Sequence, residues 1–250
     1  MLGWLTDRRR KKLEEAPFPA EWQAHLDSNV VMAARLDVAM QERLRDLTAV
    51  FIDEKGWEGC GGLEMTDEVR VTVAAQACLL LLGREHSLYE DVETILVYPS
   101  TMMAPGRRDG HVVHEEGVAI LGQAHGNGGP VILAWDDVLE GGREVGERNV
   151  VIHEFAHKID MVDGAVDGTP PLPDRAARET WARVCSEAFL ELQQRVEAGK
   201  RTFIDEYGAT NEAEFFAVAS EHYWCQPKKL ERNEPELFEL LRAFYQFDPV

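Results

Sequence analysis

Cysteine is scarce in this sequence of 250 residues. The chain contains only Cys60, Cys78, Cys185 and Cys225, which are far apart and form no Cys-x-x-Cys pair. A cysteine-based zinc site needs closely paired thiols, so this class of site is not expected. We expect buried or free thiols in a reducing compartment.

Long hydrophobic runs are missing as well. The most apolar stretch, residues 69–82, is interrupted by Arg70, Thr72 and Gln76. It is shorter than the roughly 20 apolar residues that a membrane-spanning helix needs. The basic run at residues 8–12 follows the first apolar residues, which is not the order of a signal peptide. The sequence therefore predicts a cytoplasmic protein with no membrane partner.

Positive charge is in deficit. Lys and Arg total 26 against 45 Asp and Glu, which gives a formal net charge of −19. Such a charge repels phosphates, so we expect no direct binding of nucleic acid. The hydrophobic content of 45% is ordinary for a globular domain.

The patterns that are present predict an α+β fold. Apolar residues recur at helical spacing in the N-terminal and C-terminal regions, and short β-branched runs in the middle predict strands. We expect helical regions around a small, mainly antiparallel sheet, in a single domain over residues 1–250 with a flexible tail at 1–17 and a helical part at 18–93. The expected helices are 27–53, 66–82, 175–198, 211–224 and 234–245, the expected strands are 94–99, 111–114, 118–121 and 130–135, and the expected loops are 56–62 and 102–110.

His153, Glu154 and His157 form an HExxH motif on a further expected helix, which follows residue 148. Residues at i and i+4 lie on the same face of a helix, so the two imidazoles can bind one metal ion, with zinc the expected metal. Glu154 lies beside them and can take a proton from a metal-bound water. The alternative is that the histidines only pack or cap a helix. The flanking Val150–Ile152 and Phe155 predict a buried helix. Burying the two histidines and Glu154 in it without a partner is unfavourable, which favours the metal site.

A catalytic zinc site needs a third protein ligand. Glu214 and Glu221 share a face of the helix at 211–224, and either can supply it. Glu214 also fits a capping box with Asn211, which is a purely structural role. Asp163, six residues after His157, is a weaker candidate because no glycine releases the chain between them. From the residues alone, the third ligand stays open.

Residues 149–164 and 209–221 together strongly resemble the zinc metallopeptidases of the MtfA (Mlc titration factor A) family. Residues 61–83 and 129–138 are similar to the same family, and the resemblance extends from about residue 18 to residue 249. It implies a zincin-like catalytic part at 94–250 and aminopeptidase activity. It also implies binding of the glucose repressor Mlc, so an Mlc-like transcriptional repressor is a candidate partner beside the peptide substrate.

The resemblance also implies roles for individual residues. His153, His157 and Glu214 correspond to the zinc ligands and Glu154 to the general base. An upstream histidine of the family that reaches the metal in the resting form corresponds to His114, with His111 as the alternative.

Supporting roles follow from the chemistry that peptide hydrolysis needs. Tyr207 precedes the ligand helix and is our candidate for stabilising the oxyanion. Asp160 and Glu221 are candidates for orienting the ligand imidazoles. The strand at 130–135 offers an edge to an extended peptide. The rival interpretation is a binding protein that sequesters a regulator and whose metal site is secondary.

Overall fold

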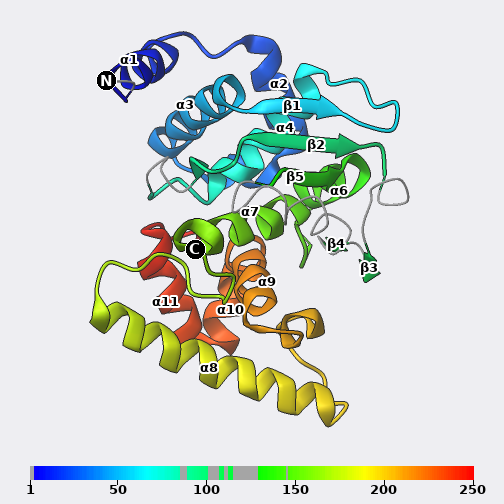
Figure 1. The fold of residues 1–250 in the computed structure, drawn as a ribbon, viewed down its shortest axis with the longest axis vertical. Coiled ribbons are helices and arrows are strands. Elements are labelled where there is room, and N and C mark those ends of the chain that lie inside the picture. Colours follow the sequence, from blue (N-terminus) through cyan, green and yellow to red (C-terminus); the bar gives the residue numbers. More distant parts are fainter. Residues whose placement is uncertain (1–2, 85–88, 101–106, 110–111, 115–128, 145) are drawn as a thin grey trace.

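We describe the protein from a computed structural model (Figure 1). The structure describes residues 3–84, 89–100, 107–109, 112–114, 129–144 and 146–250, with the backbone alone for residues 3–7, 107–109 and 112–114. Within these ranges, no helix combines the length and the apolar character that crossing a bilayer requires.

The N-terminal part is helical, as predicted. Asp37 caps the helix that begins at Val38 by accepting a hydrogen bond from the backbone N–H of Met40 at 2.8 Å. Its elements are α1 (Gly3–Glu14), α2 (Ala20–Asn29), the 3-10 turn η1 (Val31–Arg35), α3 (Val38–Glu54) and α4 (Asp67–Leu79). The helix expected at 66–82 is therefore confirmed, whereas the one expected at 27–53 is broken at Val30–Asp37.

The tail expected at residues 1–17 contains helix α1. Arg9 and Arg10 on α1 each lie 2.6 Å from a carboxylate of α3, on Asp53 and Glu54 respectively. These ion pairs hold α1 against α3. Spacing alone did not indicate this helix, because its sequence is dominated by charge.

The main sheet is parallel, so the prediction of a mainly antiparallel sheet is wrong. Its order is β1 (Gly56–Gly59), β2 (Thr94–Tyr98) and β5 (Val131–Ala134), and both pairs of strands run parallel. A crossover through α4 returns the chain to the start of the sheet, which makes β2 parallel to β1. A short apolar run predicts a strand but not its direction. Strand β1 also occupies residues expected to be loop.

A second, smaller sheet is antiparallel. It pairs β3 (Arg107–Asp109) with β4 (Val112–His114). The sequence predicts instead a loop at 102–110 and a hairpin between 111–114 and 118–121. The strand at 112–114 is therefore present with a different partner, while residues 118–121 lie outside the described residues.

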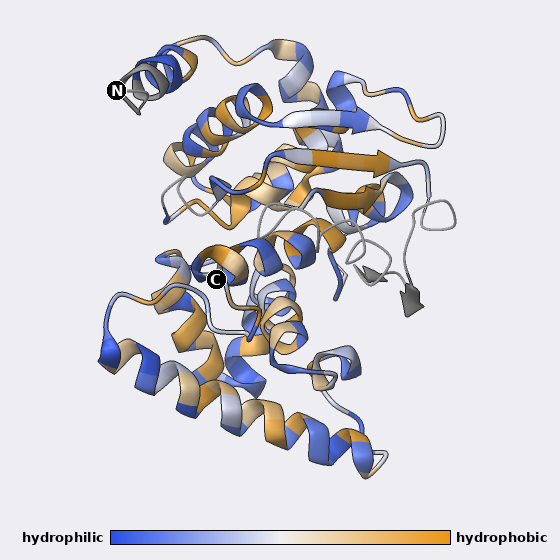
Figure 2. Cartoon of the chain, viewed as in Figure 1, coloured by the Kyte–Doolittle hydropathy of each residue, from blue (hydrophilic) through white to orange (hydrophobic). Residues whose placement is uncertain are grey.

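Helix α7 lies between the sheet and the C-terminal helices (Figure 1). Hydrophobic residues line β2 and β5 above it, and much of α8 is hydrophilic (Figure 2). The helices expected at 175–198, 211–224 and 234–245 are confirmed. The elements of this half are α6 (Trp135–Arg143), α7 (Val150–Asp160), the turn η4 (Met161–Asp163), α8 (Arg175–Glu197), the turn η5 (Glu206–Ala209), α9 (Glu212–Cys225), α10 (Pro227–Asn233) and α11 (Pro235–Tyr245).

Candidate metal centre

Helix α7 carries the HExxH motif into the core. Asn149 starts the helix, because its side chain accepts a hydrogen bond from the backbone N–H of Ile152 at 3.0 Å. The apolar side chains of α7 are fully buried from Val151 to Ile159, and most of the polar side chains between them are buried too. His153 is 1% exposed and Glu154 is 6% exposed. Polar groups so deeply buried need partners.

Helix α9 supplies the partner for the histidines. It begins at Asn211, whose side chain accepts from the backbone N–H of Glu214 at 2.9 Å. The small residues Ala213 and Ala217 on α9 are buried, which allows α7 and α9 to pack closely. Glu214 thus lies in a capped first turn and directs its carboxylate to the two histidines.

The three candidate ligand atoms form a nearly regular triangle. Glu214 Oε2 lies 3.0 Å from His153 Nε2 and 3.3 Å from His157 Nε2, and the two ring nitrogens are 3.2 Å apart. A tetrahedral zinc ion with bonds of about 2.0–2.1 Å has ligand atoms about 3.3 Å apart. The residues present therefore fit such an ion without rearrangement.

Glu221 completes the setting of His153. Its Oε1 lies 2.7 Å from His153 Nδ1, and its Oε2 accepts from the backbone N–H of Asn149 at 2.5 Å. A carboxylate bound to Nδ1 keeps the proton on that nitrogen and leaves Nε2 free as a ligand. The two candidates for the third ligand thus lie at different positions. Glu214 belongs to the ligand triangle, and Glu221 lies on the Nδ1 side of the His153 imidazole.

The electrostatics of the cluster favour a positive charge at its centre. Burial lowers the pKa of His153, but hydrogen bonds with Glu214 and Glu221 outweigh it and raise the pKa to about 10. Burial raises the pKa of Glu214, but hydrogen bonds with the two imidazoles hold it well below its ordinary value. The two carboxylates therefore favour positive charge at the ligand triangle.

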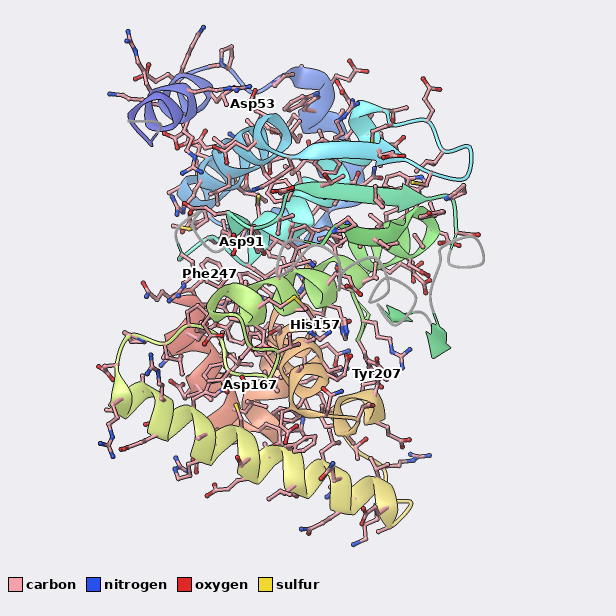
Figure 3. The ribbon with its side chains drawn as sticks, viewed as in Figure 1. Asp53, Asp91, His157, Asp167, Tyr207 and Phe247 are labelled. Carbon is pink, nitrogen blue, oxygen red and sulfur yellow. The ribbon has the colours of Figure 1, made fainter. Side chains whose placement is uncertain are left out.

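Tyr207 lies beside this cluster. Its ring centroid is 6.0 Å from that of His153, and it projects from η5, just before α9. Figure 3 labels Tyr207 and His157 on neighbouring parts of the same region. The structure thus brings this predicted residue to the site.

Asp160 and Asp163 have other places. Asp160 accepts from the backbone N–H of Gly168 at 2.9 Å, and Asp163 accepts from that of Ala165 at 3.1 Å. Neither belongs to the cluster of metal-binding type. The buried Nδ1 of His157 and Oδ1 of Asp160 have no hydrogen-bond partner within the described part of the chain. Asp160 therefore anchors the loop after α7 and forms no hydrogen bond with His157.

The upstream histidines cannot be placed at the site. His111 lies outside the described residues, and so does the side chain of His114. The prediction that one of them reaches the metal stays a prediction.

Comparison with known proteins decides the family. The family model described as glucose-regulated metallo-peptidase M90 matches residues 4–246. The chain belongs to this family. The MtfA resemblance drawn from the motifs is thereby confirmed. Membership of a metallopeptidase family also implies that the protein binds a metal ion.

Similar proteins match over almost their whole length. An uncharacterized protein of Synechocystis sp. is 37% identical over 99% of this chain and 90% of its own. The Mlc titration factor A of Serratia proteamaculans is 30% identical over 92% of this chain and 88% of its own. That of Yersinia pestis is 27% identical over 100% of this chain and 92% of its own.

Sequence reasoning missed Gln76 and the full role of Asn149. Asn149 carries a visible signal, since Asn before an apolar helix is a common cap. Gln76 carries none, because it is one polar residue in an apolar helix. Gln76 accepts a hydrogen bond from the side chain of Asn149, whose backbone N–H donates to Glu221.

Proposed function

We propose that this member of the metallopeptidase family is a zinc-dependent aminopeptidase. The observation that carries the proposal is the triangle of His153 Nε2, His157 Nε2 and Glu214 Oε2. Two imidazoles and one carboxylate are a ligand set of catalytic zinc sites, and structural zinc sites are usually cysteine-rich. When bound, zinc supplies a Lewis acid that lowers the pKa of water and polarises a carbonyl.

Glu154 is the general base of the proposed reaction. It follows a ligand directly on α7 and is almost wholly buried. It accepts the proton of the attacking water and delivers it to the leaving amine. Tyr207, beside His153, donates its hydroxyl proton in a hydrogen bond to the oxyanion.

The substrate is positioned by main-chain and charge interactions. Strand β5 is paired with β2 on one side only among the described strands, so its other edge can pair with an extended peptide. The net charge of −19 attracts a positively charged amino terminus. This supports cleavage from the amino end.

Replacing the base tests the peptidase proposal. Glu154→Gln keeps the size of the side chain and removes its basicity, so hydrolysis of amino-acid anilides should fall about 10²–10⁴-fold. The zinc content should stay that of the wild type, because the ligands are unchanged. Wild-type rates in Glu154→Gln, or hydrolysis that survives chelators, would show that this site is not the peptidase centre.

A second candidate function is binding of a transcriptional repressor. The relatives named Mlc titration factor A support it, since their name indicates titration of Mlc. Calorimetry of the chain with a purified Mlc-like repressor tests it, and Glu154→Gln should bind as well as the wild type. If the wild type holds such a repressor tightly yet shows no chelator-sensitive hydrolysis, the function is sequestration and the metal site is secondary.

A further inference from the structure

Buried hydrogen bonds connect helix α4 to the metal-binding imidazole of His153. Gln76 on α4 accepts, through Oε1, a hydrogen bond from Asn149 Nδ2 at 2.7 Å. The backbone N–H of Asn149 donates to Glu221 Oε2 at 2.5 Å, and Glu221 Oε1 accepts from His153 Nδ1 at 2.7 Å. A residue of α4 is thus linked to His153 through two intermediates.

The orientation of each amide in this series is fixed by its other partners. Asn149 Oδ1 accepts from the Ile152 N–H, while Asn149 Nδ2 also donates to the Gly141 carbonyl at 2.9 Å. Gln76 Nε2 donates to the Val138 carbonyl at 3.1 Å. Since neither amide can be flipped without losing these bonds, the direction of donation is determined.

The series is also closely packed. Gln76 is 0% exposed, Asn149 is 1% exposed and Glu221 is 4% exposed. A Cβ atom added to Gly142 on α6 would lie 2.8 Å from Gln76 Nε2, and one added to Gly141 would lie 3.0 Å from the Asn149 Cα. The α6 backbone therefore leaves the amides no room to move. Such constraint is what holds a site in one geometry.

We propose that Gln76 and Asn149 are positioning residues of the metal centre. Gln76 fixes the side chain of Asn149, and this side chain fixes the peptide N–H that holds Glu221. Glu221 in turn keeps a proton on His153 Nδ1 and turns Nε2 toward His157 and Glu214. The inference deepens the proposed function and rests on it.

Gln76→Leu tests this inference, because it replaces the acceptor for Asn149 by an apolar side chain of similar size. Loss of an outer partner of a metal ligand typically weakens metal binding about 10–100-fold. Gln76 acts from further out, so we expect about a 10-fold weaker zinc affinity, measured by competition with a chromophoric chelator. Asn149→Ser keeps a capping oxygen but loses the amide group that donates to Gln76 and Gly141. It should weaken zinc binding in the same way, and it provides the test if Gln76→Leu does not fold.

A second measurement needs no metal. In metal-free protein with ¹⁵N-labelled histidine, the Nδ1–H proton of His153 should be protected from exchange with water by Glu221. This signal is identified by its loss in His153→Gln. Exchange should be faster in Gln76→Leu than in the wild type, because the N–H of Asn149 no longer holds Glu221 in a fixed position.

Ser220→Ala is the matched control. Ser220 is a buried polar residue next to Glu221, and its hydroxyl is bonded to Phe216 and Tyr245. This variant should lose stability but keep wild-type zinc affinity and Nδ1–H exchange. The inference is overturned if folded Gln76→Leu and Asn149→Ser match the wild type in both measurements. If the wild type binds no zinc, the proposed function fails, and the exchange measurement still decides the role of Gln76.

Discussion

Replacing Glu214 by Gln should abolish most of the stabilisation that zinc gives to the folded chain. The substitution keeps the shape of the side chain and removes the only carboxylate of the ligand triangle, 3.0 and 3.3 Å from the two ring nitrogens. Loss of an outer partner alone raises the dissociation constant about 10–100-fold. Loss of a ligand should therefore raise it at least about 100-fold.

These dissociation constants can be converted into zinc-induced shifts of the melting temperature. Free zinc buffered at about 100 times the wild-type dissociation constant stabilises the native state by about 2.7 kcal/mol. For a chain of 250 residues, each kcal/mol corresponds to about 2–4 °C. The wild type should gain about 5–10 °C on adding zinc. With a 100-fold larger constant the gain falls to about 0.4 kcal/mol, or about 1–2 °C.

The assay is differential scanning fluorimetry of each variant with chelator and with buffered zinc. Because only the zinc-induced shift is compared, any effect of the substitution on the metal-free protein cancels. Glu212→Gln is the matched control, since Glu212 is an exposed acid in the same helical turn and its replacement removes the same charge. An equal zinc shift in Glu214→Gln and the wild type would refute Glu214 as a ligand.

Two further predictions concern the surroundings of the site and the surface. Asn211→Ala removes the cap of α9, so the free energy of unfolding measured in urea should fall by about 1 kcal/mol. Zinc binding should also weaken, because Glu214 lies in the first turn of that helix. An unchanged free energy of unfolding would contradict the capping role. Burial and the neighbouring Glu14 and Glu42 raise the pKa of Asp46 above its ordinary 3.8, so its ionised form is less favourable in the folded than in the unfolded chain. That penalty exists above the raised pKa and vanishes well below 3.8, so Asp46→Asn should raise the urea midpoint at pH 7 but not at pH 3, and an equal effect at both pH values would exclude this explanation.

The sequence predicted helices far better than sheet geometry. Helices α8, α9 and α11 were found within a residue or two, because apolar spacing and end signals such as Asn211 and Gly199 are local. The parallel direction of β1 and β2 was missed, because it depends on the path of the crossover through α4. Helix α1 was missed because ion pairs with α3 hold it, and these are contacts between distant residues.

The same distinction holds at the site. The spacing of His153 and His157 alone places two imidazoles on one helix face, since i and i+4 are neighbours on any helix. The choice between Glu214 and Glu221 was open from periodicity, because both share one face of α9. The packing of α7 against α9 distinguishes them. The carboxylate of Glu214 lies at the Nε2 atoms of His153 and His157, and that of Glu221 lies at Nδ1 of His153.

The sequence by itself thus indicated the residue types of the site: two histidines one helical turn apart, the adjacent Glu154, and a further carboxylate on a later helix. The family resemblance already pointed to Glu214 as the third ligand, but only the tertiary structure shows its carboxylate at both histidines and that of Glu221 at Nδ1 of His153. The structure alone connects Gln76 to that imidazole, because hydrogen bonds between residues 73 positions apart in the chain leave no local pattern.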